Sequence, residues 1–560
     1  MCGIFGCICD CNAYDKVLRG LELLQYRGYD SCGIAFYEDC FKIEKVVGTL
    51  KNLPKKTTDA SIVFGHTRWA TNGIVNETNA HPHVSFDGKI TIVHNGIIKN
   101  ADLIKNQLIK RGIKFYSQTD TEVIANYIAY NIQNESIEHV LKNLFKDMEG
   151  SFSLIVGTSS GVLYLVKQFS PLNVLKTKEA IYISSDISSL ASGELYSLKD
   201  GDIIKIESKT IAKLNDKNFV FENHENTLYS LSHNNYKHFM LKEIYETPFA
   251  IQNTYFSIKD NTCLNIVKKY NKLTLLGCGT AYHSCLIGEY LLKNECKKDV
   301  ESFLASNYEI KSEISKKHLH IIVSQSGETA DCIKIAQEIL KHGGEILLIT
   351  NESKSSLAQM CKYKIFTNAE KEIAVASTKT YCCQVFVFAY LCYKLLNENY
   401  TIEIHDFIYV LRKYISSIKI VDIAEQLKNY DKMILLASGI DYLTILEASL
   451  KIREIDYVYT LPMFAAELKH GTLSLIDENA VVLTLDSCKN NQKIQTAVNE
   501  IKSRNGKVVN MNQDIGNQID TFFKPIFTII PFQLLSYQIA VLNNRNPDMP
   551  RNLAKSVTVE

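Results

Sequence analysis

The second half of the chain repeats one pattern of short apolar runs, and this repeat limits the possible fold more than any other feature. Three runs recur after about 160 residues, which is one domain's length. The matched pairs are Leu273–Thr280 with Met433–Ile440, His320–Val323 with Val481–Leu485, and Ile346–Thr350 with Val508–Met511. Apolar runs that alternate with helical patterns are typical of a parallel sheet wrapped by helices. We therefore predict two copies of a doubly wound α/β unit, at residues 256–395 and 420–545, joined by a helical connector at residues 396–419.

Residues 1–225 have a different pattern, with short runs in which apolar and polar residues alternate. Alternation of this kind predicts β-strands. Two helical patterns interrupt the runs, Asp15–Leu24 and Thr121–Asn131, and Asp120 is expected to cap the second. This arrangement predicts a sheet-rich α+β domain with helices packed on its faces.

Two further segments lie outside these domains. Residues 226–255 are the predicted interdomain linker, because the part up to residue 235 is polar and poor in aliphatic side chains. Pro248 is expected to end or kink any helix in this linker. Residues 546–560 form a C-terminal tail that two prolines stiffen and three aliphatic residues can anchor. From the tail sequence alone, Lys555 would be interpreted as a mobile surface lysine.

The composition is that of a globular soluble protein, since 46% of the 560 residues are hydrophobic and 22% are charged. A formal net charge of +1 gives no electrostatic reason to expect nucleic acid or a membrane as a partner. We find neither a signal peptide nor an apolar run of about 18 residues. The 16 cysteines lack zinc-ligand spacing, so we expect reduced thiols, a cytoplasmic location and no bound metal.

Cys2 directly follows the initiator methionine and becomes the first residue if Met1 is removed, which so small a side chain permits. A terminal cysteine combines a nucleophile with a base, because a free α-amine has a pKa of about 7.7–8.0. The amine can take the thiol proton directly or through a water molecule. By its position alone Cys2 would be a buried, inert thiol, and only its polar companions reverse that interpretation.

Four polar clusters accompany Cys2, at residues 25–31, 65–71, 94–96 and 118–120. A thiolate that attacks an amide needs hydrogen-bond donors for the oxyanion, which the Asn95 side chain and the Gly96 N–H can supply. Arg68 offers a fork for an α-carboxylate, and Asp120 offers an anion for an α-ammonium. The set describes recognition of free glutamine at both ends of its backbone. Each cluster alone is ordinary turn chemistry, and Asn-Gly is first of all a hairpin signal.

The two α/β copies differ where their matched strands end. In the first copy, Leu319–Val323 opens into Ser324–Thr329, whose hydroxyl and N–H groups precede a helix and favour an anion site. Because Glu328 opposes a purely electrostatic phosphate cradle, hydroxyl donors must dominate. The second copy has residues 486–490 in this place and lacks the cluster, which predicts one such anion site per chain. Without its surroundings, Ser324–Thr329 would be explained equally well as a helix cap.

The second copy supplies titratable groups instead. Glu447, Lys451 and Glu454 are spaced i, i+4 and i+7 along the predicted helix 443–457, so they share one face. The commonest outcome of such spacing is a solvated face with one ion pair. His470 follows in the sequence AAELKHG, where it would ordinarily be a structural residue before a glycine.

Six motifs resemble the glutaminase domain of the N-terminal-nucleophile amidotransferases: MCGIFG, LQYRGYDS, GHTRWAT, NAHPH, HNGII and SQTDTE. The full pattern resembles the glutamine–fructose-6-phosphate aminotransferase family over almost the whole chain. The resemblance implies that Cys2 is the nucleophile, that Asn95 and Gly96 form the oxyanion hole, and that Trp69 gates an ammonia passage. The implied glutamine-binding residues are Arg68, Trp69, Thr71 and Asp120. Asn72 stands where the family usually has histidine, so any charged contact from that position is in doubt.

For the repeated units the resemblance implies sugar isomerase (SIS) domains, which bind phosphosugars. The implied substrate-binding residues are Thr280, Ser324, Gln325, Ser326, Thr329, Val375, Ser377 and Lys451. Glu454 would move a proton between C1 and C2, His470 of a partner subunit would open the sugar ring, and Lys555 would form a Schiff base. Ala281 stands where the family commonly has serine, so one hydroxyl contact is expected to be missing.

The implied reaction hydrolyses glutamine, passes ammonia inside the protein and converts fructose 6-phosphate to glucosamine 6-phosphate, the first step of the UDP-N-acetylglucosamine pathway. No metal or organic cofactor is implied, and the expected assembly is a homodimer. Two alternatives stay open: an enzyme of this architecture with another sugar acceptor, and a phosphosugar-sensing protein whose chemistry has decayed. The presence of Cys2, Glu454 and Lys555 argues against the second.

Overall fold

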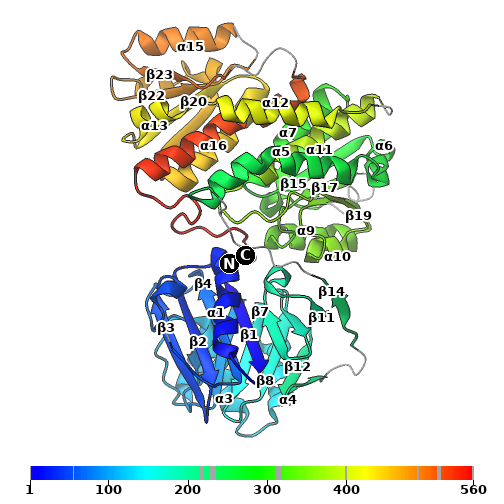
Figure 1. Ribbon diagram of the computed structural model, residues 1–560, viewed down its shortest axis with the longest axis vertical. Coiled ribbons are helices and arrows are strands. Elements are labelled where there is room, and N and C mark those ends of the chain that lie inside the picture. Colours follow the sequence, from blue (N-terminus) through cyan, green and yellow to red (C-terminus); the bar gives the residue numbers. More distant parts are fainter. Residues whose placement is uncertain are drawn as a thin grey trace. The chain divides into compact units, whose positions relative to one another are not determined.

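The structure is a computed structural model that describes residues 2–54, 56–214, 219–225, 235–310, 318–397, 400–487, 491–513 and 519–557. Apart from the extreme C-terminus, the chain divides into two compact units, Met1–Ser232 and His233–Lys555 (Figure 1). Three segments named in the predictions lie outside the described residues: 226–234 of the linker, 488–490 in the second α/β copy and 558–560 of the tail.

The first unit is built on two antiparallel sheets. Their strand orders are β14-β11-β9-β10-β1-β4-β2-β3 and β13-β12-β8-β7-β6-β5. The first sheet contains β1 (Gly3–Cys9), β2 (Ser31–Tyr37), β3 (Phe41–Val47), β4 (Ile62–Arg68), β9 (Asn173–Lys176), β10 (Ala180–Ser184), β11 (Gly193–Ser197) and β14 (Glu222–His224). The second contains β5 (His83–Val84), β6 (Ile90–Ile98), β7 (Gly150–Thr158), β8 (Leu163–Gln168), β12 (Ile203–Glu207) and β13 (Thr210–Lys213).

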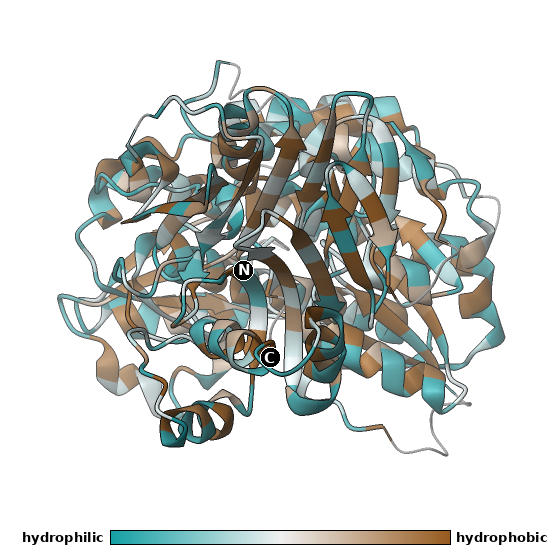
Figure 2. Ribbon diagram, turned by 90° about the horizontal axis from the view of Figure 1, so that it is seen from below, coloured by the Kyte–Doolittle hydropathy of each residue, from teal (hydrophilic) through white to brown (hydrophobic). Residues whose placement is uncertain are grey.

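Helices cover the outer faces of both sheets, which confirms the predicted α+β domain. Successive side chains of a strand point to opposite faces, so Ile4 of β1 packs between the sheets against Ile155 of β7. Phe5 of β1 packs on the outer face with Leu21 of α1. The helices are α1 (Ala13–Leu24) on the first sheet, and α2 (Ala101–Lys110), α3 (Asp120–Asn131) and α4 (Ile137–Asp147) on the second. In Figure 2 the central strands are mostly brown, as strands buried on both faces should be.

Two local predictions in this unit are wrong. Thr119, not Asp120, caps α3, because the Thr119 side chain accepts the Glu122 N–H while Asp120 is already helical. Asn95-Gly96 does not form the hairpin turn that its sequence alone indicates. It lies inside β6, where Asn95 pairs with Ser153 of β7. The neighbouring strand overrides the local turn preference of Asn-Gly.

The second unit contains two parallel sheets with matching strand orders, so the predicted repeat is confirmed. The orders are β16-β15-β17-β18-β19 and β21-β20-β22-β23. The first sheet contains β15 (Lys272–Gly277), β16 (Asp299–Leu304), β17 (Leu319–Val323), β18 (Glu345–Thr350) and β19 (Tyr363–Phe366). The second contains β20 (Lys432–Ala437), β21 (Tyr459–Phe464), β22 (Val481–Thr484) and β23 (Lys507–Asn510). Both faces of both sheets are covered, as a doubly wound fold requires.

The described residues of the second unit contain the helices α5 (Phe239–Ile258), α6 (Ile266–Lys269), α7 (Thr280–Asn294), α9 (Ala330–Lys341), α10 (Ser356–Met360), α11 (Lys379–Leu396), α12 (Ile404–Ser417), α13 (Val421–Leu427), α14 (Ile440–Lys451), α15 (Gln492–Lys502) and α16 (Lys524–Leu542). Pro248 lies inside α5 and does not end it. Core contacts of Ile244 and Ile251 on both sides of the proline hold the helix together.

Helix α16 corrects the expectation about apolar runs. With the turn before it, Thr521–Leu542 is the one described segment long and apolar enough to cross a membrane by length and composition. Of its apolar window, 83% is buried inside the protein. Buried Gln533 and Ser536 interrupt its apolar sequence, and Phe527 and Ile530 pack into the core of the second unit.

Candidate active sites

The Cys2 thiol is held by the backbone of the residue after β4. The Trp69 N–H donates to Cys2 Sγ at 3.3 Å, and Sγ lies 3.4 Å from the Trp69 carbonyl oxygen, to which it donates. Burial raises the pKa of Cys2 above its ordinary value, although the N-terminal amine and Arg68 act in the opposite direction. Since a thiol of raised pKa is neutral near pH 7, this nucleophile needs a base at short range.

The Asn95 side chain is fixed beside Cys2 at both ends of its amide. Asn95 Nδ2 donates to the Cys2 carbonyl oxygen at 3.0 Å, while Oδ1 accepts from His66 Nε2 at 3.1 Å. His66 Nε2 also contacts the His94 carbonyl oxygen at 3.0 Å. Burial lowers the pKa of His66 to about 3, so the ring is neutral and the two acceptors place its proton on Nε2. His66 therefore turns the amide nitrogen of Asn95 toward the nucleophile, where an oxyanion donor is needed.

Gly96 is required by the packing of two strands. Its φ of 138° is unfavourable for other residues, and a Cβ would lie 1.9 Å from the Ser151 carbonyl oxygen. A side chain at this position would push β7 away from β6. The position next to Asn95 is thus set by the sheet.

Arg68 and Asp120 are both buried, 3% and 8% exposed, as charged residues rarely are without a partner. Arg68 Nη2 donates to the backbone oxygens of Asn72 and Gly73. Arg68 Nη1 is buried and has no hydrogen-bond partner among the residues that the structure describes. Asp120 Oδ2 accepts the Ile98 N–H at 2.9 Å. A buried, unpaired guanidinium N–H is a group that a bound carboxylate would satisfy.

The loop after β4 carries the remaining predicted glutamine contacts. Trp69 is half-buried and Thr71 is exposed. The Ala70 N–H donates to Asp30 Oδ2 at 2.8 Å, so Asp30 holds the loop that carries Trp69. Sequence reasoning quoted Asp30 only as part of a motif and gave it no role. Asn72 offers its carbonyl oxygen to Arg68, and a backbone contact of this kind does not depend on the residue type.

In the second unit, the Ser324–Thr329 segment lies between β17 and α9. Ser324 Oγ and Thr329 Oγ1 are 3.0 Å apart, and Ser324 Oγ accepts the Gly327 N–H at 3.1 Å. Thr329 precedes α9 but makes no side-chain cap bond, so a helix cap does not account for the cluster. Glu328 turns away and accepts from the Ser356 N–H and hydroxyl at 2.7 and 2.8 Å. Its carboxylate is therefore hydrogen-bonded by α10 donors, and Gln325 and Ser326 stay partly exposed beside the hydroxyls.

The corresponding place in the second copy is filled by carboxylates. The Ser487 N–H donates to Asp441 Oδ2 at 2.7 Å, and the Asn491 N–H donates to Asp486 Oδ2 at 2.9 Å. These backbone donors, which could serve an anion, already bind the protein's own anions. The described part of this loop thus lacks free donors for an anion, as the sequence predicted for the second copy.

Glu447, Lys451 and Glu454 form a buried cluster, so the alternative of a solvated face is wrong. Lys451 Nζ lies 3.3 Å from Glu447 Oε1, 2.5 Å from Glu454 Oε2 and 3.1 Å from Thr280 Oγ1. A π-helical turn, Ile452–Asp456, follows α14 and carries Glu454. Burial raises the pKa of Glu454 above its ordinary value, and Lys451 opposes that rise. A carboxylate of raised pKa next to a cation suits proton transfer near neutral pH.

Two partners of this cluster come from α7. The Thr280 hydroxyl donates to Glu447 Oε1 at 3.0 Å, and His283 Nδ1 lies 2.7 Å from Glu447 Oε2. His283 was not predicted, although its place one turn after Thr280 on a helix was a usable signal. His470, by contrast, is exposed, and no hydrogen bond or ion pair joins it to the cluster among the described residues.

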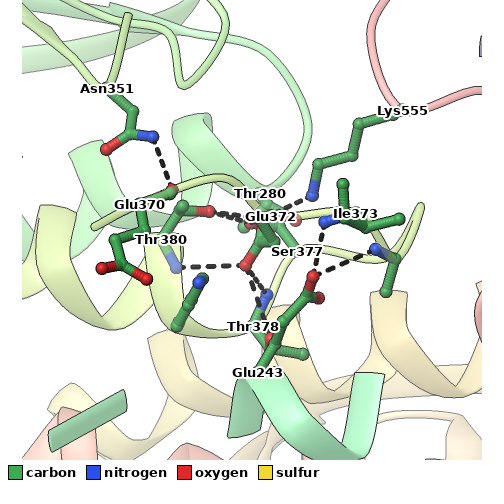
Figure 3. Close-up of polar contacts among 12 residues, drawn as sticks. Glu243, Thr280, Asn351, Glu370, Glu372, Ile373, Ser377, Thr378, Thr380 and Lys555 are labelled. Carbon is green, nitrogen blue, oxygen red and sulfur yellow. Dashed lines mark hydrogen bonds and ion pairs between the residues drawn. The ribbon is translucent and has the colours of Figure 1, made fainter. Parts of the chain in front are cut away.

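The Lys555 side chain is buried and forms an ion pair with Glu372 (Figure 3). Glu372 lies in the loop between β19 and α11, which also carries the predicted contacts Val375 and Ser377. The Ser377 hydroxyl donates to Glu372 Oε2 at 3.1 Å. Sequence reasoning missed Glu372, because nothing local distinguishes it from other glutamates in loops.

Asp548 fixes the tail that carries Lys555. Its carboxylate accepts the N–H groups of Phe239 and Met240, at 2.9 and 2.7 Å, at the beginning of α5. Its carbonyl oxygen accepts the Val375 N–H at 3.0 Å. The tail is therefore tied both to a helix N-terminus and to the Glu372 loop. The anchor is the Asp548 carboxylate, whereas Val557, one of the three aliphatic residues expected to anchor the tail, is 43% exposed.

Comparisons with known proteins identify two domain families in the chain. The glutamine amidotransferase domain family matches residues 66–192, and the SIS domain family matches residues 266–393 and 426–532. A protein of Pyrococcus horikoshii named glutamine–fructose-6-phosphate aminotransferase (isomerizing) is 37% identical over 602 residues. One of the same name from Clostridium tetani is 35% identical over 613 residues. In both comparisons 100% of each chain is covered.

One solved structure resembles the second unit. It is the C-terminal domain of glucosamine-fructose-6-phosphate aminotransferase from Francisella tularensis, which is 28% identical, with a TM-score of 0.50. The match covers 57% of this chain and 100% of that domain.

Proposed function

The chain belongs to the glutamine–fructose-6-phosphate aminotransferase (isomerizing) family, and from this premise we propose that it moves the amide nitrogen of glutamine to fructose 6-phosphate, giving glucosamine 6-phosphate and glutamate. The observation that carries the proposal is the presence of two complementary sites in one chain. One holds the Cys2 thiol beside the Asn95 amide, and the other holds the Lys555 amine in a buried ion pair.

In the first unit, removal of Met1 frees the α-amine of Cys2, which takes the proton from a thiol that burial keeps neutral. The thiolate attacks the side-chain amide of glutamine, and Asn95 Nδ2 donates to the oxyanion. Arg68 Nη1 binds the α-carboxylate, and Asp120 binds the α-ammonium. Ammonia leaves, and water releases glutamate from the thioester.

In the second unit, hydroxyl and N–H groups of Ser324–Thr329 bind the phosphate at the beginning of α9. Lys555 forms an imine with the C2 ketone, ammonia replaces it, and Glu454 moves a proton from C1 to C2. Lys451 holds Glu454 within hydrogen-bond distance. Ammonia passes inside the protein, which protects it from protonation in water. No metal or organic cofactor takes part in the scheme.

Glutamine with an isotopically labelled amide tests the whole scheme. We expect glutamate release that fructose 6-phosphate stimulates, a matched yield of glucosamine 6-phosphate, and label retention in the product despite excess unlabelled ammonium. Cys2→Ala should abolish glutamate release, and Lys555→Ala should stop aminosugar formation but spare glutamate release. Glutamine-dependent synthesis that persists in Cys2→Ala would refute the nucleophile. Release without sugar dependence or product would refute the acceptor.

We also propose a homodimer in which His470 serves the partner's sugar site. An apolar patch supports it: Tyr459, Leu461 and Phe464 on the edge strand β21 and Leu475 after His470 are 80%, 41%, 44% and 61% exposed. Patches of this kind mark interaction surfaces. Mixing His470→Ala chains with Lys555→Ala chains should restore about one quarter of wild-type activity. Half of the dimers are then mixed, and in each mixed dimer one of the two sites has both an intact Lys555 and an intact His470. No restoration would refute the exchange of His470.

We further propose a cytoplasmic location. All cysteines of the described residues are free thiols, which suits a reducing compartment. Titration of accessible and total thiols in protein isolated from its own cell tests the redox part of this proposal. Disulfides in that protein would contradict it.

A further inference from the structure

Glu372 is a buried carboxylate for which the proposed reaction has so far given no task. It is 2% exposed and pairs with Lys555 Nζ, the nitrogen that attacks the sugar. Figure 3 shows the Lys555 side chain reaching from the tail down to Glu372. A buried pair of this kind needs a reason, because desolvation of two charges can exceed their mutual attraction.

The loop around Glu372 is built to keep its carboxylate ionised. Oε1 accepts the N–H groups of Thr378 and Thr380, at 2.9 and 3.2 Å. Oε2 accepts the hydroxyls of Thr380 and Ser377, at 2.7 and 3.1 Å. Burial works against ionisation, but Lys555 and these donors lower the pKa of Glu372 to about 2. Near neutral pH the carboxylate therefore carries its charge beside a cationic Lys555 nitrogen.

The other charged groups around Lys555 do not replace Glu372. Glu243 of α5 binds the N–H groups of Ile373 and Ala374, and burial and Glu372 raise its pKa to about 8. Glu454 is engaged by Lys451. The nearby cation, Lys379, is paired with Glu246 at 2.8 Å. Near neutral pH, Glu372 is the fixed negative charge in contact with Lys555.

We propose that Glu372 is the counter-ion of the Lys555 nitrogen throughout imine formation, stabilising first the ammonium and then the protonated imine with the sugar. The inference rests on the proposed function, because it requires the imine. It gives the loop between β19 and α11 an electrostatic task in addition to its contacts with the sugar.

The chemistry conserves the charge that Glu372 faces. An ammonium and a ketone give a protonated imine and water: the N–C2 bond forms, the C2–O bond breaks, and the oxygen leaves with two of the three nitrogen-bound protons. The nitrogen is cationic before and after, and only the attacking amine is neutral. Ammonia then adds to C2, the bond between C2 and the lysine nitrogen breaks, and the lysine takes two protons from the ammonia nitrogen, which gives an ammonium beside Glu372 and a neutral imine at C2. A fixed anion stabilises both cations without moving, which is electrostatic preorganisation.

Glu372→Gln tests the inference, because the amide keeps the shape and removes the charge. The matched control is Glu370→Gln, two residues earlier, where the side chain is exposed and points away from Lys555 (Figure 3). Full-length protein is incubated with fructose 6-phosphate and cyanoborohydride without glutamine. Mass spectrometry of the Lys555 peptide then gives the rate of imine trapping against pH.

The rate of imine trapping should rise with pH and then reach a plateau. In Glu372→Gln we expect the midpoint of this rise to move to lower pH by about one unit or more, because the ammonium loses its counter-ion. The plateau rate should fall by about 10-fold or more, because the protonated imine loses the same charge. Glu370→Gln should match the wild type. An unshifted midpoint, or a shift to higher pH, would overturn the inference.

Glu372→Asp keeps the test decisive if Glu372→Gln does not fold. It retains the charge, so we expect the wild-type midpoint with a lower plateau, and a shifted midpoint would count against a counter-ion. The proposed function has a separate criterion. If wild-type protein gives no Lys555 adduct and no aminosugar, the proposed function fails, whereas adduct formation with an unshifted Glu372→Gln midpoint refutes the counter-ion alone.

Discussion

At the scale of single residues, the surroundings of each buried group decide its protonation state. Burial keeps His66 neutral and makes it a fixed donor to Asn95, and burial also keeps the Cys2 thiol protonated. Glu372 is also buried but stays ionised, because hydrogen-bond donors and a lysine surround it. Burial of a titratable group thus gives opposite outcomes according to its neighbours.

Four of the buried histidines in the first unit should make it sensitive to acid. Burial lowers the pKa values of His66, His81, His83 and His94, so the unfolded chain binds protons that the folded chain excludes. Stabilisation is therefore complete above about pH 6.5 and is lost as pH falls, by about 1.4 kcal/mol per pH unit for each histidine. Denaturant unfolding between pH 5 and 7 measures the slope. His83→Gln should reduce it, and His139→Gln, 64% exposed on α4, should not. Equal slopes in all three proteins would contradict the argument.

Removing Lys451 should destabilise the second unit strongly. Lys451→Ala leaves Glu447 and Glu454 without their shared cation, and breaking a buried pair from one side costs about 3–5 kcal/mol. Urea unfolding measures the loss, and aminosugar synthesis should disappear with it. Lys428→Ala is the control, because its pair with Glu425 is exposed and should change stability by about 0.5 kcal/mol or less. If the unfolding free energies of the two variants differed by only about 1 kcal/mol, a broken buried ion pair would not explain the effect.

At the scale of elements, chemistry lies where regular structure is interrupted or crowded. Asn95 and Gly96 lie in the middle of β6, and the π-helical turn after α14 carries Glu454. Such turns inside helices are rare and are frequent at functional sites. Positions of this kind are determined by the neighbouring element, as β7 determines that residue 96 is glycine.

Gly96→Ala should disrupt the first unit through β6. The new methyl group would meet the Ser151 carbonyl oxygen at 1.9 Å with φ at 138°, so we expect a loss of about 3 kcal/mol or more and little glutamine hydrolysis. Gly112→Ala is the control, because Gly112 has a φ of 88° but no atom within 4 Å of its Cβ position. It should lose about 1 kcal/mol from backbone strain alone. Similar losses in both variants, measured by denaturant unfolding, would contradict the steric argument.

At the scale of the whole molecule, residues far apart in sequence build the sugar site. The C-terminal tail, the beginning of α5 and the loop before α11 meet at Asp548, which binds Phe239, Met240 and Val375. Lys555 is seven positions further along a tail that contains no regular structure among its described residues. Its placement beside Glu372 therefore depends on this anchor.

Asp548→Ala should release the tail and separate the two reactions. The N–H groups of α5 lose their acceptor, so we expect aminosugar synthesis to fall by about 10-fold while sugar-free glutamine hydrolysis persists. Limited proteolysis should remove the tail faster than in the wild type. Asp422→Ala, an exposed aspartate in the first turn of α13, is the control and should change neither readout. Normal synthesis together with rapid tail cleavage would show that the anchor is dispensable.

The sequence by itself determined the repeated α/β architecture and the sheet-rich α+β class of the first unit, and it supplied the candidate residues of both sites. It did so because period-two and helical patterns report which face is buried, and because the motifs around Cys2 and His470 are local. Tertiary structure alone decided that Asn95-Gly96 is a strand, that Pro248 lies within a helix, and that Thr119 caps α3. It also brought His283 to Glu447, and Glu372 to Lys555 from 183 positions away. Contacts of that range depend on how elements pack, and no local pattern carries that information.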